Sequence, residues 1–277
     1  MSGKVATETG GKGAVRARRY GSFYVAEHRL RAMRAYLGTM ILGSVGNPLV
    51  YLFALGLGLA SLVDRSLDSG TNGPVSYLVF VAPALLAGAA VTVAAEETTY
   101  PILLGFKWNP IFSGMAASPI APRQVANGVY LAIAVRIIPT CVVYFAAMVL
   151  FGAVPSAVGF LGVLTAVLTG MTVGALIGSY TSTVEEDKGQ MAIIMRFGIA
   201  PMFLFSGTFF PLSQLPIYLQ WIGWISPLWH GAQLGRVSSY GLIEPMWLTI
   251  LHLVYLVALL VLGWRRTQVV FERRLNR

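Results

Sequence analysis

The sequence predicts an all-α integral membrane protein with six transmembrane helices and both termini in the cytoplasm. Of its 277 residues, 56% are hydrophobic and 11% are charged, whereas soluble domains have about 25% charged residues. The charged residues are clustered, and the uncharged stretches between clusters match the roughly 20 residues that a helix needs to cross a bilayer. The alternating pattern of a transmembrane β-barrel is absent from these stretches, so we expect helices.

Six stretches qualify as spans of one transmembrane domain, residues 37–264. Only two charged residues lie inside them, Arg136 and Arg196. The polar and basic residues 1–36 precede the first span, so we expect that span to act as its own insertion signal. The predicted spans are residues 37–59, 75–95, 125–151, 157–180, 191–210 and 246–264.

The distribution of Lys and Arg orients these spans, because cytoplasmic connections carry an excess of both residues. Sixteen lie in the N-terminal segment, in two connections on the same side and in the tail at 265–277, whereas the opposite connections hold only Arg65 and Arg236. Both termini are therefore expected in the cytoplasm, with a basic tail at 265–277. This bias and attraction to anionic lipid explain the formal net charge of +9, so no nucleic-acid partner is indicated.

The N-terminal segment divides into a polar tail and an amphipathic helix. Residues 1–15 are expected to be disordered. Residues 16–36 carry an apolar stripe at steps of three and four, while charged side chains lie off the stripe. This pattern predicts a helix on the cytoplasmic leaflet, and a solvated helix packed on a partner is the alternative. The stripe comprises Phe23, Ala26, Leu30, Met33 and Leu37.

Several residues inside the spans are candidates for packing or function. Gly170, Gly174 and Gly178 predict a ridge that lets another helix approach closely, although glycine is also simply common in spans. Arg196 lies five residues into its span and is expected to reach the headgroups. Arg136 lies deeper and cannot reach the headgroups as readily. Both arginines are candidates for function, because charged residues within spans usually face protein or water.

The segment after the fifth span, residues 211–245, stays apolar although two prolines interrupt it. Pro216 suits a helix start, and Ser226-Pro227 ends one helix and begins another. Its tryptophans favour the membrane interface. We therefore expect two short helices on the extracellular side that partly re-enter the outer leaflet.

Four stretches resemble a known family. They are GSVGNPLVYLFALGLGL at 43–59, MAASPIAPRQVANG at 115–128, FSGTFFPLSQLP at 205–216 and ISPLWHGAQLGR at 225–236. Together with the six spans, they resemble the ABC type-2 export permeases, most of all the nodulation lipo-oligosaccharide and daunorubicin-resistance permeases.

The resemblance implies the permease subunit of an ATP-driven exporter in a bacterial cell membrane. It implies a cargo that is lipid-linked, a glycolipid or a drug-like amphiphile. It also implies a separate ABC ATPase dimer that holds ATP and Mg, and a second permease copy or related permease nearest spans one and five. The sequence agrees, because GGKG at 10–13 lacks the spacing and the Ser/Thr of a phosphate-binding loop. No cofactor and no catalytic activity are expected in this chain.

The family also implies that the connection between spans two and three couples the permease to its ATPase. This connection, residues 98–119, carries more contiguous apolar surface than a solvated loop. The alternative is a loop packed beneath its own bundle. Glu96 and Glu97 precede it, and we expect them to pair with arginines of the amphipathic helix rather than only to end the span. The candidate coupling residues are Tyr100, Phe106, Lys107, Trp108, Ile111 and Phe112.

The cargo path is the least visible feature of the sequence. Aromatic residues of span five favour an amphiphile, although plain packing would use them equally well. The candidates for the path or its outer gate are Arg196, Phe203, Phe205, Phe209 and Phe210.

Two other functions compete with export by an ABC permease. A proton-coupled secondary transporter generally needs a carboxylate within the membrane, and none of the six predicted spans contains Asp or Glu. An intramembrane enzyme needs a metal motif or a nucleophile–base pair, and neither is evident.

Overall fold

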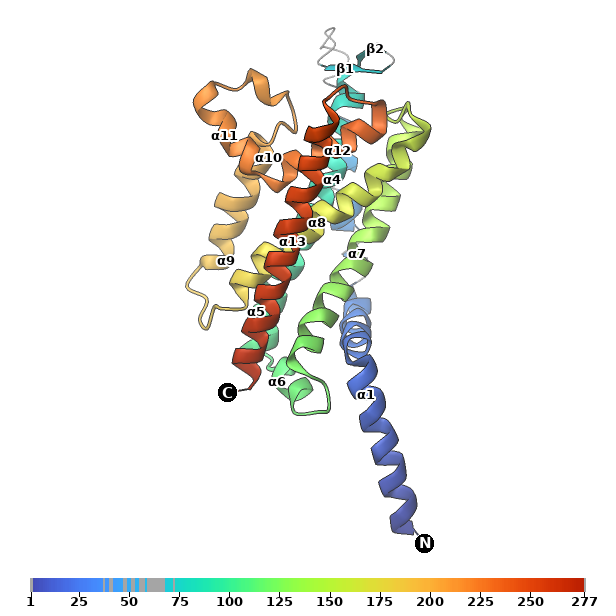
Figure 1. The fold of residues 1–277 in the computed structure, drawn as a ribbon, viewed down its shortest axis with the longest axis vertical. Coiled ribbons are helices and arrows are strands. Elements are labelled where there is room, and N and C mark those ends of the chain that lie inside the picture. Colours follow the sequence, from blue (N-terminus) through green and yellow to red (C-terminus); the bar gives the residue numbers. More distant parts are fainter. Residues whose placement is uncertain are drawn as a thin grey trace.

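The computed structural model describes residues 2–36, 38–39, 42–46, 49–50, 53–54, 58, 68–71 and 73–276. The predicted first span, residues 37–59, therefore lies largely outside the described residues. The rest forms an elongated bundle of helices (Figure 1). The start of α1 and the end of α13 lie at one end, here the termini end. A small β-hairpin and α11 lie at the opposite end, here the hairpin end.

Four helical segments of the described chain are long and apolar enough to cross a membrane. They confirm the all-α class and correspond to four of the predicted spans. Most boundaries agree within three residues, but the first segment and the last extend eleven residues beyond their predicted ends. The four segments are Tyr77–Phe106, formed by α4 (Tyr77–Thr98) and α5 (Tyr100–Phe106), then α7 (Pro122–Leu150), the segment Ala157–Thr181 that contains α8 (Leu161–Thr181), and α13 (Met246–Leu275).

The predicted fifth span, residues 191–210, is shorter in the structure. The apolar helix there runs from Gln190 to Phe205 and consists of α9 (Gln190–Ile193), a π-helical turn (Ile194–Ile199) and α10 (Ala200–Phe205). At 1.5 Å per residue this helix is roughly 24 Å long, less than the roughly 30 Å hydrocarbon core. Residues 206–210 form a turn.

The centre of the bundle is α8, which packs against α4, α7, α12 and α13. The three glycines expected to permit close packing lie on its contact faces. A Cβ at Gly170 would be 2.7 Å from the Ala90 carbonyl oxygen, and one at Gly174 would be 3.2 Å from Ala94 Cβ, both on α4. Gly178 faces the Tyr130 hydroxyl group of α7 at 2.8 Å. A side chain at Gly170 would therefore push α4 away.

The segment 211–245 contains two short helices that begin where the prolines predict. They are α11 (Ile217–Ile225), after Pro216, and α12 (Pro227–Tyr240), which starts at Pro227. Most of α11 is exposed, whereas α12 is largely buried between α4, α8 and α13. The hairpin of β1 (Asp68–Gly70) and β2 (Gly73–Val75), paired from Asp68↔Val75 to Gly70↔Gly73, lies against the end of α12.

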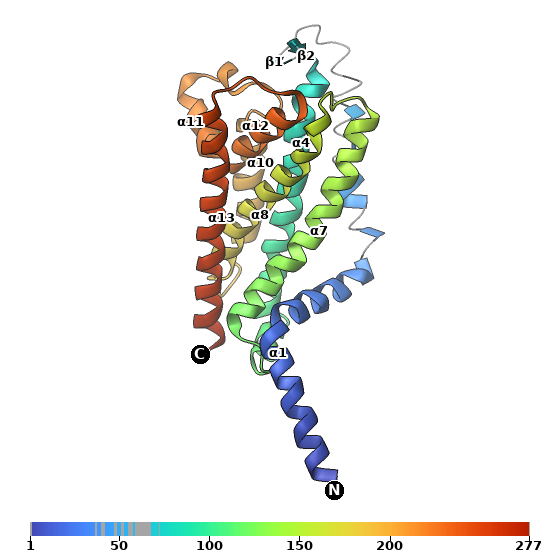
Figure 2. The ribbon, with the colours of Figure 1, turned by 45° about the vertical axis from the view of Figure 1, so that its right-hand side comes forward.

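At the N-terminus, α1 (Ser2–Met33) bends at Tyr20, whose backbone is not helical. The first part leads away from the bundle, and the second part lies across α7 (Figure 2). The backbone is thus helical through residues 2–15, where the sequence analysis expects disorder. A short 3-10 turn, Arg34–Tyr36, follows.

The second part of α1 contacts the bundle through Val25 and through part of the predicted apolar stripe. Val25 and Ala26 are buried, whereas Phe23 is exposed. The reason is close packing, because a Cβ at Gly128 of α7 would lie 2.5 Å from Val25 Cβ and 2.6 Å from the Ser22 carbonyl oxygen. Within the stripe, Ala26 and Leu30 therefore lie beside α7, whereas Phe23 is exposed.

At the C-terminus, α13 continues to Leu275 through the segment 265–277 that the sequence analysis separates as a basic tail. Phe271 is buried, and Arg123 near the start of α7 pairs with Glu272 at 2.5 Å. Trp264 Nε1 and Gln268 Nε2 both donate to Asn127 Oδ1 of α7, at 2.9 and 2.7 Å. These contacts hold the end of α13 on the bundle.

Candidate functional site

The predicted coupling segment lies at the termini end, below the bundle (Figure 1). After α4 the chain turns at Thr99, whose hydroxyl group donates to the Ala95 carbonyl oxygen at 2.9 Å. The short helix α5 follows, and α6 (Ile111–Ala116) lies beside it. Because α5 continues directly from α4, any displacement of α5 acts on a helix of the core.

One half of the coupling segment packs inward. The Phe106 ring lies 5.0 Å from Phe112 and 4.7 Å from Phe271 of α13, between ring centroids. Phe112 is buried, and Phe106 and Ile111 are half-buried. The Arg274 guanidinium lies 4.0 Å from the Phe106 centroid. Phe106, Ile111 and Phe112 therefore fit the alternative of a loop packed beneath its own bundle, and Phe106 is not free to anchor another protein.

The other half of the segment faces outward. Tyr100, Leu104 and Trp108 are 43%, 44% and 53% exposed. Tyr100 and Leu104 lie one turn apart on α5, and Trp108 lies in the turn that follows α5. The Tyr100 and Trp108 rings are stacked with centroids 6.4 Å apart. We call these three residues the aromatic ridge. Beside it, Lys107 Nζ lies 3.4 Å from Glu186 Oε1 in the connection after α8.

A cluster of four charges connects α4 with two other helices just above this segment. Arg29 of α1 pairs with Glu97 at 3.0 Å, and Arg136 of α7 pairs with Glu96 at 3.1 Å and also with Glu97. The Glu97 side chain is only 4% exposed. We call these four residues the charge cluster. Since a buried carboxylate without a counter-charge is costly, Glu97 fixes α1 and α7 on α4.

The charge cluster answers two questions that the sequence leaves open. Glu97 does pair with an arginine of the amphipathic helix. Arg136, counted as deep in its span, is level with the end of α4, because α7 begins beyond that end and passes it (Figures 1 and 2). Counting residues within α7 alone therefore overestimates how deep Arg136 lies.

The residues predicted for the cargo path are spread over the π-helical turn, α10 and the turn that follows. Arg196 is exposed in the π-helical turn, while Phe203 contacts Gly88 of α4. Phe205, Phe209 and Phe210 are half-buried. The structure thus brings Phe203 against the core and leaves Arg196 exposed on the π-helical turn.

At the hairpin end, Arg236 is a residue whose position the sequence analysis missed. It counted there as an extracellular charge, but it is 2% exposed. Its guanidinium donates to the carbonyl oxygens of Phe80 at 3.3 Å and Gly207 at 2.6 Å, and it stacks on the Phe80 ring. Arg236 therefore joins α12 to α4 and to the turn after α10.

A second polar group at the hairpin end joins α12 to α13. His230 Nδ1 and His252 Nδ1 are 2.7 Å apart, and His252 Nε2 lies 3.6 Å from Glu244 Oε2. Burial lowers the pKa of His230 to about 4, and the positive charge of a protonated His252 would act in the same direction. Burial alone would raise the pKa of Glu244, but the nearby His252 and a hydrogen bond from the Thr249 hydroxyl group lower it below its ordinary value.

Comparison with known proteins decides the family. Residues 29–240, which include Arg29, the aromatic ridge and both short helices at the hairpin end, match the family model described as ABC-2 type transporter. The chain belongs to the ABC-2 type transporter family. The resemblance found in the four sequence stretches is thereby confirmed.

Relatives of this ABC-2 permease match most of its length. Nodulation protein J of Rhizobium leguminosarum bv. viciae is 30% identical over 239 residues, 86% of this chain and 88% of that protein. Nodulation protein J of Rhizobium meliloti (strain 1021) is 27% identical over 237 residues, 85% of this chain and 86% of that protein. The protein of the same name in Neorhizobium galegae is 26% identical over 238 residues, which are 85% of this chain and 87% of that protein. No solved structure matches the chain significantly.

Family membership and the apolar helices together make this chain a multi-pass membrane protein and the transmembrane subunit of an ABC exporter. In such a permease, surfaces that meet partners matter more than a catalytic centre. The aromatic ridge and the charge cluster are the features at the termini end that fit this requirement.

Proposed function

We propose that this ABC-2 permease exports a lipid-linked molecule, a glycolipid or a drug-like amphiphile across the inner membrane of a bacterium, driven by a separate ATPase dimer. ATP and Mg²⁺ bind to that partner, and a second permease copy or a related permease completes the path. The observation that carries the proposal is the aromatic ridge, an exposed apolar surface at the termini end of a chain without a phosphate-binding loop.

The distribution of charge supports a cytoplasmic position for the ridge. It lies at the same end as both chain termini (Figure 1). The segments at this end contain most of the Lys and Arg residues that lie outside the predicted spans. Such an excess is typical of the cytoplasmic segments of a membrane protein. ATP is available only on that side of a bacterial inner membrane, so a docked ATPase would meet the ridge there.

The contacts around the ridge support its role in coupling. Tyr100, Leu104 and Trp108 lie on or next to α5, while Phe106 and Phe112 hold the inner side of the segment against α13. A force on the ridge is passed to α4 through the turn at Thr99. The charge cluster then passes it from α4 to α1 and α7.

The choice of an amphiphile as cargo rests on the helix from Gln190 to Phe205. Arg196 and Phe197 are adjacent and exposed on its π-helical turn, so a cationic and an aromatic side chain lie together. That pair suits a molecule with an anionic group and an apolar part. The same exposed face is where a second permease would pack in the arrangement that we propose.

A proton-coupled secondary transporter remains the competing function. The argument against it from the predicted spans is weaker than the sequence analysis states, because α4 extends to Thr98 and includes Glu96 and Glu97. Glu97, however, is paired with two arginines. A carboxylate neutralised in this way is a structural contact rather than a free proton carrier, so the ABC exporter is favoured.

The test is a double replacement, Tyr100→Ala with Trp108→Ala. Large aromatic residues at the centre of an interface contribute about 2 kcal/mol or more each, which corresponds to about thirtyfold in affinity. We expect the variant to co-purify with the ATPase at least thirtyfold more weakly and to lose export, while it still inserts in the membrane. The measurements are affinity for the ATPase, transport and the elution volume of the purified permease.

The matched control is Trp221→Ala on α11. Trp221 is 54% exposed, close to the 53% of Trp108, but it lies at the hairpin end. This control should bind the ATPase normally. Normal binding and full export in the Tyr100→Ala, Trp108→Ala variant would exclude the ridge as the coupling surface.

A further inference from the structure

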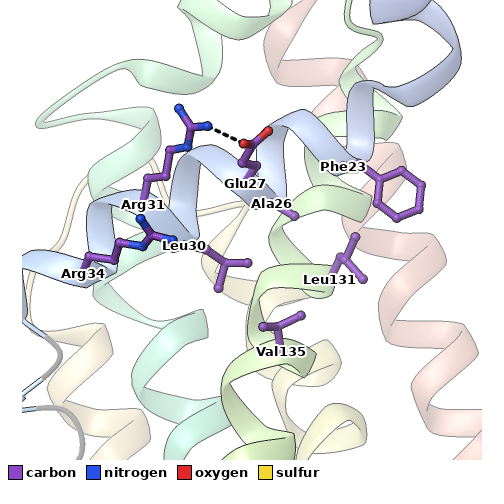
Figure 3. A pocket seen from close by; sticks show the side chains of 8 residues that line it. All are labelled: Phe23, Ala26, Glu27, Leu30, Arg31, Arg34, Leu131 and Val135. Atoms are coloured by element: carbon purple, nitrogen blue, oxygen red, sulfur yellow. Dashed lines mark hydrogen bonds and ion pairs between the residues drawn. The ribbon is translucent and has the colours of Figure 1, made fainter.

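A groove of about 850 Å³ lies between the second part of α1 and the outer face of α7. Figure 3 shows its apolar side, where Ala26 and Leu30 of α1 point toward Leu131 and Val135 of α7. Phe23 closes one end. The groove exists because α1 is held against α7 at Gly21 and Gly128, next to which the two helices approach most closely.

The other side of the groove is charged. In Figure 3 the Glu27 and Arg31 side chains lie on the side of α1 away from Leu131 and Val135, and they pair with each other at 2.5 Å. Their charges cancel. Arg34 also lines the groove, and it makes no ion pair with any carboxylate in the described part of the chain. The rim therefore carries one net positive charge, on Arg34.

Arg29, the nearest other arginine on α1, is not available to a ligand in this groove. It points to the opposite side of the helix, where Glu97 binds it at 3.0 Å. Arg34 is therefore the cation of the groove, while the pair between Arg29 and Glu97 fixes the helix that carries Arg34.

The apolar floor continues beyond the groove along α7. Leu131, Val135, Ile138 and Val142 follow each other at steps of four, three and four, which places them on one helix face. The last three are 43%, 45% and 51% exposed. This apolar track runs from α1 toward the middle of the membrane, so a long hydrocarbon chain matches it and a small soluble anion does not.

We propose that this groove binds one anionic phospholipid of the membrane leaflet at the termini end. Its phosphate lies at Arg34, with Arg31 beside it, and one acyl chain follows Leu131 and Val135. A headgroup with a single negative charge complements the single net positive charge of the rim. The lipid fills the space between α1 and α7 and so holds the interfacial helix at the level that the charge cluster needs. The proposal does not depend on the identity of the exported molecule.

The experiment measures lipid retention by the full-length permease in detergent, using native mass spectrometry. Phosphatidylglycerol and phosphatidylcholine with the same acyl chains are titrated separately. We expect one phosphatidylglycerol to be retained at concentrations where phosphatidylcholine is not. One basic residue near an anionic lipid is worth about fivefold in affinity, so Arg34→Ala should weaken phosphatidylglycerol retention about fivefold and Arg34→Lys should retain most of it.

Two further variants separate the groove from general surface charge. Arg19→Ala removes the same charge from the same helix but outside the groove, since Arg19 lies before the bend at Tyr20. It should leave retention unchanged. Val135→Phe fills the floor without changing charge, and it should weaken retention at least as much as Arg34→Ala. Val135 is exposed and tolerates a larger apolar side chain, and the thermal unfolding of each variant checks that it is folded.

Three results would overturn the proposal. Equal losses in Arg19→Ala and Arg34→Ala would mean that retention reflects only the overall charge of α1. Equal retention of phosphatidylcholine and phosphatidylglycerol would mean that no headgroup is recognised. A co-purified species whose mass is not that of a phospholipid, lost in Val135→Phe, would assign the groove to another amphiphile.

Discussion

Glu97 binds two arginines that come from different helices. Arg29 belongs to the amphipathic α1 and Arg136 to the membrane-spanning α7, so a single carboxylate determines how both helices lie on α4. The pair between Glu27 and Arg31 has the same chemistry, but both of its side chains are more than half exposed. Comparing Glu97 with Glu27 therefore distinguishes an ion pair that holds helices together from an ion pair on the surface of one helix.

We expect Glu97→Ala to destabilise the permease by about 3–5 kcal/mol, because it leaves the largely buried Arg29 without a carboxylate and Arg136 with Glu96 alone. Glu27→Ala is the matched control and should cost at most about 1 kcal/mol, as exposed ion pairs do. Thermal unfolding of both purified variants measures the difference. Equal stability of the two variants would show that the charge cluster does not hold α1 and α7.

At the residue scale, the sequence predicted one ion pair correctly but did not predict how deep a charged residue lies in the membrane. The pairing of Glu97 with an α1 arginine could be predicted, because both residues belong to segments that border the membrane on the same side. Arg136 could not be placed, because its level depends on where α7 starts relative to α4. The roles of Phe106 and Trp108 could not be separated either, since only the packing of Phe271 shows which aromatic side is inward.

At the scale of elements, α12 is the helix whose burial is hardest to predict from its sequence. Its prolines mark its start correctly, but its polar residues suggest an exposed helix. His230, Arg236 and Ser239 are all buried, and each has a partner: His252, backbone carbonyl oxygens and the Ala153 carbonyl oxygen. Buried polar groups are tolerated when they are hydrogen-bonded. Such long-range contacts leave no local pattern in the sequence.

The buried His230 gives α12 a pH dependence whose sign is defined. Its pKa is about 4 in the folded protein, below the ordinary value of about 6.5. Between these values the unfolded chain binds more protons at this residue, so stability is present above pH 6.5 and is lost as the pH falls toward 4. His252 and Tyr255 of α13 face the same imidazole, and Glu244, in the segment before α13, lies 3.6 Å from His252.

We therefore expect the melting temperature of the permease to be lower at pH 5 than at pH 7, and this difference to shrink in His230→Phe. Phe keeps an aromatic ring against Tyr255, so the loss of titration is tested apart from the loss of stacking. His28→Phe, at an exposed position on α1, is the control and should keep the wild-type pH dependence. A His230→Phe variant with the full wild-type difference would assign the pH dependence to other groups.

At the scale of the whole molecule, the two ends are built differently. The termini end is held by ion pairs between helices: Arg29 with Glu97, Arg136 with Glu96 and Glu97, and Arg123 with Glu272. At the hairpin end the buried polar groups of α12 bind backbone carbonyl oxygens, as Arg236 does, or a polar side chain of α13, as His230 does with His252. Side-chain charges suit a membrane boundary that faces a partner.

Apolar stretches of the sequence predicted four of the long helices, because burial in lipid requires continuous apolar surface. They did not predict that α13 continues to Leu275, since its last residues are basic and are held by Phe271 and by Arg274, which donates to the Ser182 and Val184 carbonyl oxygens. Hydropathy reports where lipid ends. It does not report where a helix ends when protein contacts extend it.

The orientation of the whole molecule is testable with single cysteines, because the chain's own Cys141 is buried and should not react. Ser213, in the turn before α11 at the hairpin end, and Ser113, on α6 at the termini end, are both exposed. If the excess of Lys and Arg marks the cytoplasmic side, a membrane-impermeant maleimide added to intact cells should label Ser213→Cys and leave Ser113→Cys unlabelled. Opening the membrane with detergent should then expose Ser113→Cys to the reagent. The unmodified chain measures background from Cys141. Labelling of Ser113→Cys alone in intact cells would invert the orientation, and it would remove the aromatic ridge from the side on which ATP is available.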